Sequence, residues 1–405
     1  MEGATGSGGT PGTGGVGVIT NPGGVSRTGG TGNAGVIIGA GGASMTTCLR
    51  YGGLPVPMPT DLQTDNDNCG ACGIECSGIS PSTAQCVAGS CLVTLASGLL
   101  LPDDIAIGAT SVYWTNFSGT VMKVPMEGGL PTTLASGQGN PGYIAVDATS
   151  VYWTNAGTAN FDYMEGTVMK VPLGGGTPAT LASLQNPYSG IAVDAGSIYW
   201  TNAGTRSSDY TNGTVMKVGL GGGTSMTLAS GQADPEYIAV DATSVYWTNL
   251  GTSKNNYADG TVMKVPLDGG VPTTLASQQT RPGYIAVDAV SVYWTNTGTY
   301  DNSVYNNDGA AMKVPLGGGA TTTLASGQSA PLGIAVDGSS VYWTNAGTMH
   351  NGFTDGAVMK VSVGGGVPIV LASGQSSPSG IAVDSASVYW TTTVAGGTVM
   401  KLTPK

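Results

Sequence analysis

The sequence is poor in the side chains on which most enzymes rely. Its 405 residues include one histidine, His350, and five glutamates, and only 9% of the chain is charged. Acid–base catalysis draws mainly on histidine and carboxylates, and His350 has only Asp355 as a nearby partner in sequence. Neither a Gly-x-Ser-x-Gly elbow nor a phosphate-binding glycine loop is present. The sequence therefore predicts a protein that is not an enzyme and that holds no cofactor.

Positive charge and long apolar runs are scarce as well. Of the 13 basic residues, seven are lysines that recur with a repeat described below, and the formal charge is −11. Such a chain has no basic patch to neutralise a phosphate backbone, which argues against nucleic acid as a partner. No apolar run approaches the ~18 residues of a membrane helix, so no membrane span is expected. No signal peptide is visible at the N-terminus.

Glycine, by contrast, is abundant, with 68 residues in the chain. It is concentrated in residues 1–47, where Thr, Ser, Pro and Asn stand between the glycines. Such a segment buries too little apolar surface to offset the entropy lost on ordering. We therefore predict a disordered tether over 1–47, in which apolar patches such as 35–38 pair only transiently as strands.

All the cysteines fall within residues 48–91, at Cys48, Cys69, Cys72, Cys76, Cys86 and Cys91. An even number in a short, turn-rich segment predicts a disulfide framework, for which fifteen pairings are possible. The alternative is a zinc site formed by the pairs Cys69/Cys72 and Cys86/Cys91. The tight turns expected around 68–73 favour disulfides. Disulfides form in oxidising compartments, so we expect an exported protein, extracellular or on the cell surface.

From residue 92 onward the chain is a repeat, marked by the tetrapeptide Tyr-Trp-Thr-Asn or a close variant. It contains all the tryptophans: Trp114, Trp153, Trp200, Trp247, Trp294, Trp343 and Trp390. The intervals of 39, 47, 47, 47, 49 and 47 residues indicate a propeller or a solenoid. Each copy holds four short runs rich in β-branched and aromatic residues, bounded by turn residues, which predicts four strands. Several runs are continuously apolar, as expected for strands covered on both faces.

The number of copies of each strand predicts how the repeat closes. The Ile-Ala-Val-Asp strand, or its variant, and the Met-Lys strand each occur seven times, whereas a Leu-Ala-Ser strand follows Met-Lys only six times. The seventh Leu-Ala-Ser copy stands at 95–97, ahead of the first full repeat. We therefore predict an all-β fold, a seven-bladed β-propeller over 92–405, whose N-terminal strand acts as a clasp. Closure removes the edges that an open array would expose.

These motifs resemble the YWTD propeller repeats of lipoprotein-receptor ectodomains over residues 92–405. That family has six blades and Asp at the fourth motif position, where this chain has Asn or, in the last copy, Thr392. The resemblance implies a related fold and does not imply shared ligands. The stretch Asn-Cys-Gly-x-Cys-Gly-x-x-Cys at 68–76 is similar to cysteine-rich modules of secreted or surface proteins of myxobacteria and their relatives.

The recurring side chains are expected to be structural. The tryptophans should pack between blades, each burying about 150–250 Å², and the methionines of the Met-Lys strand should fill the core beside them. The repeated aspartates precede tight turns, where a carboxylate bonds nearby backbone N–H groups. The repeat lysines are expected either to pair with these acids or to lie along the blade surface with their ammonium groups in water.

Loop length divides the two faces of the propeller. The first-to-second and third-to-fourth strand turns are short and uniform, whereas the second-to-third strand loops of blades two to six are about ten residues long. Each long loop carries an aromatic residue at a matching position, and three of them carry an aspartate just after it. These ligand-binding candidates are Tyr163, Tyr210, Tyr257, Tyr305, Phe353, Asp259, Asp308 and Asp355. Such a rim suits sugar stacking or a peptide anchored by tyrosines.

The sequence leaves three functions open. The first is an exported, surface-tethered, non-enzymatic propeller that binds a protein or glycan through its long-loop face. The second is an inert structural repeat protein, and the third is a hydrolase or lyase in the central channel. Calcium on the loop oxygens is a weaker expectation, because no twelve-residue calcium loop is present. Ligand identity, disulfide connectivity and oligomeric state do not follow from the sequence.

Overall fold

The computed structural model describes residues 17–20, 25–29, 36–39, 63–64, 66, 69–70, 76, 84–157, 165–186, 190–301 and 304–405. The chain divides into two compact units, Met1–Leu92 and Val93–Lys405. Within the described residues, helix is limited to short 3-10 turns, and none of these is long or apolar enough to cross a membrane. The fold is all-β, as predicted.

The first unit contains short strands and two disulfides. Residues 17–39 hold a three-stranded antiparallel sheet of β1 (Gly17–Thr20), β2 (Val25–Gly29) and β3 (Val36–Gly39). The apolar patch at 35–38 thus coincides largely with β3. The rest of 1–47 lies outside the described residues, so the predicted disorder of the tether stays a prediction.

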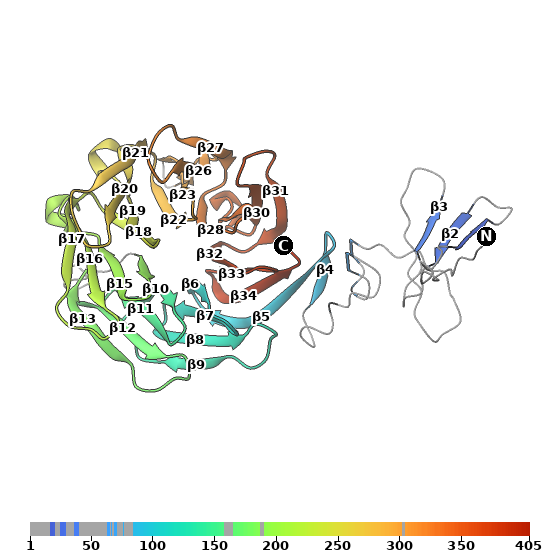
Figure 1. Cartoon of the computed structure of the whole chain (residues 1–405), viewed down its shortest axis with the longest axis horizontal. Helices are drawn as coiled ribbons and strands as arrows, with labels where there is room; N and C mark the ends of the chain where they lie inside the picture. Colours follow the sequence, from blue (N-terminus) through green and yellow to red (C-terminus); the bar gives the residue numbers. More distant parts are fainter. Residues whose placement is uncertain are drawn as a thin grey trace, which may run out of the picture. The chain divides into compact units, whose positions relative to one another are not determined.

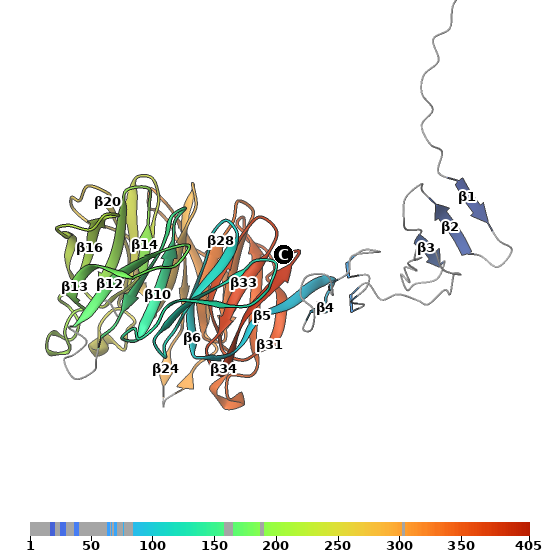
Figure 2. The same ribbon diagram turned by 90° about the horizontal axis from the view of Figure 1, so that it is seen from below.

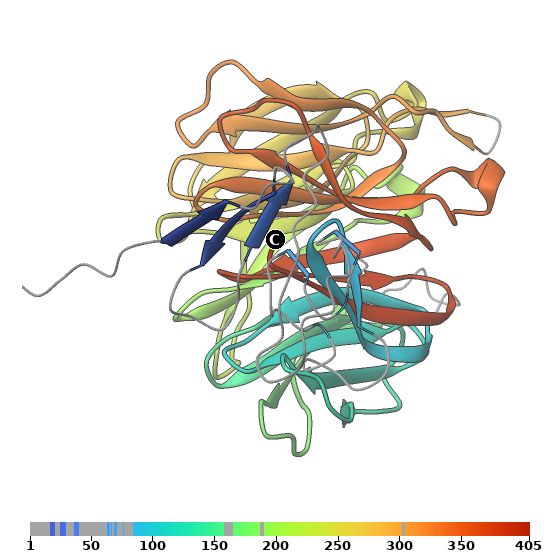
Figure 3. The ribbon, with the colours of Figure 1, turned by 90° about the vertical axis from the view of Figure 1, so that its right-hand side faces the viewer.

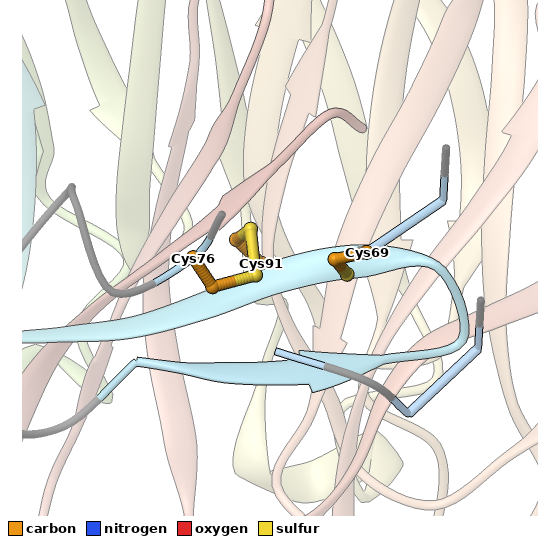
Figure 4. Close-up of side chains that lie close together, drawn as sticks. All are labelled: Cys69, Cys76 and Cys91. Atoms are coloured by element: carbon orange, nitrogen blue, oxygen red, sulfur yellow. A yellow bond between two sulfur atoms is a disulfide. The ribbon is translucent and has the colours of Figure 1, made fainter. Parts of the chain in front are cut away.

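The disulfides join Cys69 to Cys86 and Cys76 to Cys91. Cys86 and Cys91 face each other across a hairpin of β4 (Gln85–Val87) and β5 (Ser90–Leu100). The sulfurs of Cys69, Cys76 and Cys91 lie within 4.8 Å of one another (Figure 4), because the two disulfides are adjacent. Disulfide bonding is therefore confirmed for these four cysteines, in place of the zinc alternative. Cys48 and Cys72 lie outside the described residues.

The second unit is a seven-bladed propeller, seen down its axis in Figure 1, made of six four-stranded sheets and one five-stranded sheet. In chain order the first three blades are β6 (Pro102–Ile107), β7 (Ser111–Asn116), β8 (Thr120–Pro125) and β9 (Thr132–Ala135); β10 (Pro141–Val146), β11 (Ser150–Asn155), β12 (Gly166–Pro172) and β13 (Ala179–Gln185); and β14 (Ile191–Val193), β15 (Ser197–Asn202), β16 (Gly213–Gly219) and β17 (Met226–Gln232).

The fourth, fifth and sixth blades follow the same order. They are β18 (Pro235–Val240), β19 (Ser244–Asn249), β20 (Gly260–Pro266) and β21 (Thr273–Gln279); β22 (Pro282–Val287), β23 (Ser291–Asn296), β26 (Gly309–Pro315) and β27 (Thr322–Gln328); and β28 (Pro331–Val336), β29 (Ser340–Asn345), β30 (Gly356–Ser362) and β31 (Ile369–Gln375).

The seventh blade confirms the predicted clasp. Its strands run β32 (Pro378–Val383), β33 (Val388–Thr392), β34 (Ala395–Thr403), β5 and β4, so a strand from before the first blade completes the last one. The first strands of neighbouring blades contact each other around the whole ring, including β32 against β6. Closure therefore leaves no unpaired first or last blade.

Burial explains the continuously apolar second strands. In β7 and β11 every residue of Ser-Val-Tyr-Trp-Thr-Asn is buried, whereas the outer strand β17 begins with two exposed residues. All seven tryptophans are 0% exposed. Trp247 of the fourth blade packs with Tyr199 and Val215 of the third, so the predicted core between blades is confirmed.

The long connections that the structure describes leave one face of the propeller. They contain η3 (Arg206–Ser208), η4 (Ser253–Asn255) and η5 (Met349–Asn351), and in the fifth blade a hairpin of β24 (Tyr300–Asp301) and β25 (Val304–Tyr305). Figure 2 shows β24 projecting beyond the blades, and Figure 3 shows the 3-10 turns on the same side. We call this side the long-loop face and the opposite side the short-turn face.

Candidate binding site at the mouth of the central channel

The recurring polar side chains bond to one another inside the blades. In six blades the indole Nε1 donates to a glutamine at or just beyond the end of the preceding blade's fourth strand, over 3.0–3.2 Å. In the fourth blade, for example, Gln232 also accepts a bond from Asn249, the last residue of the motif, at 3.0 Å. The motif asparagine thus serves the scaffold.

Two further recurring residues connect each blade to the next. The motif threonine donates to a carbonyl of the following blade's first strand, as Thr248 does to Gly283 over 2.9 Å. In six blades the repeat lysine donates to a carbonyl in the following blade's third-to-fourth strand turn, over 2.5–3.0 Å. In the sixth blade Lys360 donates instead to the carbonyl of Lys405, over 3.3 Å. The last lysine, Lys401, donates to Met126 and so continues the series across the closure. Carbonyls therefore bind these lysines, although Lys217 also has a weak ion pair with the exposed Asp268.

The repeated aspartates hold the short turns, as predicted. Asp241, for example, accepts bonds from the backbone of Thr243 and Ser244 and from the hydroxyl of Tyr246, at 2.7–2.8 Å. These bonds lower the carboxyl pKa, against a raising effect of burial that is the largest single contribution. The whole short-turn side is thus a scaffold in which polar groups are paired.

One position on the first strands breaks the repeat. It immediately precedes the isoleucine that recurs in each first strand. In blade order it is occupied by Asp104, Tyr143, Gly190, Tyr237, Tyr284, Gly333 and Gly380. These strands surround the axis (Figure 1), so the position forms a ring at the channel mouth. The glycines allow close approach: a Cβ on Gly380 would lie 2.9 Å from an oxygen of Asp104, and one on Gly190 would lie 2.8 Å from the Ile238 nitrogen.

Tyrosines from three blades meet at this ring. The rings of Tyr237 and Tyr284 are 3.9 Å apart and tilted by 32°, and Tyr143 stands edge-on to Tyr237 at 5.1 Å. The Tyr143 hydroxyl donates to that of Tyr237 over 3.1 Å. Burial at the axis raises the pKa of all three phenols well above the ordinary value. They therefore stay neutral and form a packed aromatic group across the mouth.

Three carboxyl groups lie beside these tyrosines. Burial raises the pKa of Asp103 to about 6, of Asp104 to about 7 and of Glu236 to about 8. Asp104 accepts one bond, from the Ile144 nitrogen at 3.1 Å. Within the described residues, Glu236 has no hydrogen-bond partner for its carboxyl group. These side chains are half-buried: protein surrounds them, but water in the channel reaches part of each.

A cavity of about 260 Å³ opens next to this group. It is lined by Glu236, Tyr237, Leu250, Arg281, Gly283, Tyr284, Thr297, Tyr305 and Leu332. The Arg281 guanidinium lies 4.2 Å from the Tyr257 ring centre and 5.5 Å from that of Tyr300. Its side chain makes no hydrogen bond or ion pair with any residue that the structure describes, and its Nε is buried. Positive charge, a carboxyl group and aromatic rings thus share one small cavity.

The structure places two of the predicted loop aromatics, Tyr257 and Tyr305, at or beside this cavity. Tyr257 contacts Arg281, and Tyr305 lines the cavity and packs on Tyr300 at 4.8 Å. Tyr210 and Phe353 are half-buried, and their carbonyls accept bonds from Asp234 and Ser377 at the start of the next blade. Tyr163 lies outside the described residues.

The loop aspartates close their own loops. Asp259 accepts bonds from Thr252 and Asn255, all at 2.7 Å, Asp308 accepts two from Thr299 at 2.7–2.9 Å, and Asp355 accepts from Thr348 and Asn351 at 2.7–2.8 Å. Among the described residues, only the disulfide cysteines gather three potential metal-ligating atoms within 4.8 Å. The loop aspartates therefore lie apart from one another, and their part in ligand or calcium binding stays a prediction.

Sequence reasoning missed the carboxyl groups of the channel mouth. Asp103, Asp104 and Glu236 stand where most other copies have glycine, tyrosine, serine or leucine, and this departure from the repeat was the available signal. The mutual contact of Tyr143, Tyr237 and Tyr284 was not foreseen either. His350 is exposed in η5, away from the first strands.

Comparisons with known proteins identify the fold. No family model matches the chain, and no curated protein matches it. A WD40 propeller domain of Doa1 is similar in structure, with a TM-score of 0.55 and 13% identity over 78% of this chain and 97% of that chain. An oligogalacturonate lyase in complex with manganese has a TM-score of 0.54 and 12% identity, covering 80% and 94%. A chain of a nidogen/laminin complex has a TM-score of 0.46 and 19% identity, covering 63% and 90%. The first two likenesses support a β-propeller fold and show nothing beyond the fold.

Proposed function

We propose that this chain is an exported, non-enzymatic binding propeller that recognises a protein or glycan on its long-loop face, around the channel mouth. One contrast carries the proposal. The recurring polar side chains of the blades are almost all paired, whereas Glu236 and Arg281 line a cavity at the mouth without hydrogen-bond partners among the described residues. Polar groups held unpaired in this way bind a ligand that satisfies them.

Export and surface attachment rest on the first unit. Its disulfides fit an oxidising compartment, and its cysteine-rich stretch and the YWTD-like repeats resemble segments of extracellular proteins. In this proposal residues 1–47 form the tether, 48–91 the disulfide module and 92–405 the recognition domain. Lys405 bonds to Ala386 in a short turn, which places Lys405 on the short-turn face.

A channel-site hydrolase or lyase is the second candidate function. Its support is the raised pKa of Asp103, Asp104 and Glu236, since a carboxyl group that stays protonated near neutral pH suits a general acid. Binding is preferred because the exposed His350 stands in an outer loop, apart from these acids. Propellers serve both binding and catalysis, so the fold does not decide between them.

A binding screen followed by mapping of the bound face tests the proposal. The full chain with its disulfides intact is screened against a glycan array and surface-protein extracts, with calcium and with chelator. We expect Tyr210→Ala and Tyr257→Ala to weaken binding, and hydrogen exchange to slow around η3 and η4 when ligand is bound. The matched control is Val271→Ala in a short turn, where the side chain is 87% exposed. Binding that Val271→Ala weakens and the tyrosine variants leave unchanged would contradict the assigned face. Absence of any ligand would favour an inert structural protein.

A further inference from the structure

We propose that the cavity between β18, β22 and β28 binds one ring of a glycan, with Glu236 and Arg281 bonding its hydroxyl groups and tyrosine rings packing against it. This inference rests on the proposed function and narrows it to one ligand class and one subsite. It explains why Glu236 differs from the residues at the same position of the other blades: its carboxyl group recognises the ligand.

The first argument is that a hydrogen-bond donor, Arg281, and an acceptor, Glu236, line the same cavity without pairing. Arg281 offers guanidinium N–H donors, and Glu236 offers a carboxyl group, yet the two make no ion pair within 4.0 Å. Arg281 is positioned from both sides: its backbone nitrogen donates to the Tyr257 carbonyl over 2.9 Å, and its guanidinium stacks near Tyr257 and Tyr300. A group carrying both donors and acceptors fits between such partners, and sugar hydroxyls do both.

The second argument is the chemistry of the walls. Tyr237, Tyr284 and Tyr305 contribute aromatic surface, and Leu332 contributes aliphatic surface. The C–H face of a pyranose packs on such rings while its hydroxyl groups bond at the edge, so aromatic and polar groups are needed together. An apolar peptide anchor would instead leave Glu236 and Arg281 buried and unpaired, which is unfavourable. A sugar ring therefore suits this cavity better than an apolar side chain.

The third argument is size and access. About 260 Å³ holds one ring and excludes a folded segment of protein. The cavity lies at the mouth, beside the tyrosines that cross the channel, so a chain of further sugar units would extend outward over the long loops. Terminal or exposed residues of a glycan would thus enter first.

The test uses the full chain on an array of neutral and uronate-containing oligosaccharides. Affinity for each bound oligosaccharide is then measured by calorimetry for the natural chain, Glu236→Ala and Arg281→Met. We expect at least about tenfold weaker binding for both variants, which corresponds to about 1.4 kcal/mol. Val271→Ala is the matched control, because Val271 is 87% exposed in a short turn and does not line the cavity, and this variant should bind as the natural chain does. Thermal unfolding of each variant shows that the fold is retained.

The other possible outcomes show whether the sugar subsite, the ligand class or the proposed binding function is wrong. Glycan binding that neither Glu236→Ala nor Arg281→Met alters would overturn the subsite and keep the binding propeller. No glycan binding, together with a protein ligand whose footprint covers η3 and η4, would overturn the ligand class alone. If neither glycan nor protein binds, both proposals are wrong. A preference for uronates that Arg281→Met removes would support the subsite and indicate that Arg281 pairs with the sugar carboxylate.

Discussion

The blade interior and the channel mouth are built from the same repeat but differ in how their polar groups are paired. In the interior, tryptophan, asparagine and glutamine bond to each other, and threonine and lysine connect neighbouring blades. At the mouth, one position of the repeat holds aspartate, tyrosine or glycine, depending on the blade. The carboxyl groups there have few hydrogen-bond partners. Regular positions therefore stabilise the ring, and irregular positions mark the place where a ligand would bind.

The first blade shows what the interior loses when the pattern changes. Its tryptophan, Trp114, has no partner for Nε1, and Asn116 Oδ1 is also unpaired. The reason lies in the clasp: Leu99 of β5 stands where six blades have glutamine. The clasp closes the ring but does not supply the acceptor.

The largest effect is expected from breaking the interior pairing. Gln232→Leu removes the acceptor of both Trp247 Nε1 and Asn249 Nδ2. Each donor keeps a second acceptor, Asn249 Oδ1 for the indole and Thr261 Oγ1 for the amide. The loss of two buried hydrogen bonds should therefore lower the free energy of unfolding by about 1–3 kcal/mol, as measured by urea denaturation. As control, Asp268→Ala, in an exposed ion pair at 3.9 Å, should change it by less than about 0.5 kcal/mol. If Gln232→Leu lowers the free energy of unfolding no more than Asp268→Ala does, these bonds do not stabilise the blades.

At the mouth, by contrast, a substitution is expected to raise the free energy of unfolding. The size of this gain should depend on pH. Folding raises the pKa of Glu236 to about 8 and that of Asp104 to about 7. The folded state therefore keeps protons that the unfolded state loses above about pH 4.5, so these groups lower stability as pH rises from about 5 to 8. Glu236→Gln should raise stability at pH 8 by roughly 1–2 kcal/mol, since water in the channel screens part of the charge, and should leave it nearly unchanged at pH 4.5.

Urea denaturation at a series of pH values measures this difference. The aspartates of the short turns provide the contrast. Asp241 and Asp147 have lowered pKa values, so they lose their stabilising effect only as the solution becomes more acidic than about pH 4. A Glu236→Gln variant with the same pH profile as the natural chain would show that this carboxyl titrates normally.

A smaller gain is expected from completing the first blade. Leu99→Gln places an acceptor at the position from which glutamine serves the tryptophan in the other six blades. Pairing Trp114 Nε1 should raise the free energy of unfolding by about 1 kcal/mol, measured by urea denaturation. Leu99→Ala separates the bond from the loss of leucine packing, and it should destabilise the protein. If Leu99→Gln destabilises as much as Leu99→Ala, the acceptor has not formed.

The smallest global effect is expected in the long loops. Asp355→Ala removes the bonds to Thr348 and Asn351 that close the loop around η5. Hydrogen exchange at the Thr348 amide should become faster, while the free energy of unfolding changes by less than about 0.5 kcal/mol, because the loop lies outside the blade core. A large global loss would show that the loop belongs to the cooperative core.

The sequence by itself determined the architecture of this protein. Seven tryptophans at a near-constant interval, seven first strands and a displaced Leu-Ala-Ser copy sufficed to predict seven blades and the clasp. That succeeded because a blade is a local unit whose strands are neighbours in the chain, so its periodicity is written in consecutive residues.

Only the tertiary structure decided what meets at the axis. Tyr143 and Tyr237 are 94 positions apart, yet their hydroxyl groups bond. Glu236 and Arg281 belong to different blades but line one cavity. Each first strand contributes only one or two residues to the mouth, so the combination of charge, aromatic surface and glycine there depends on how the ring closes. Loop length pointed to the face that carries this cavity, but the loop aspartates expected to bind a ligand bond within their own loops, because a carboxylate first satisfies the backbone nearest to it.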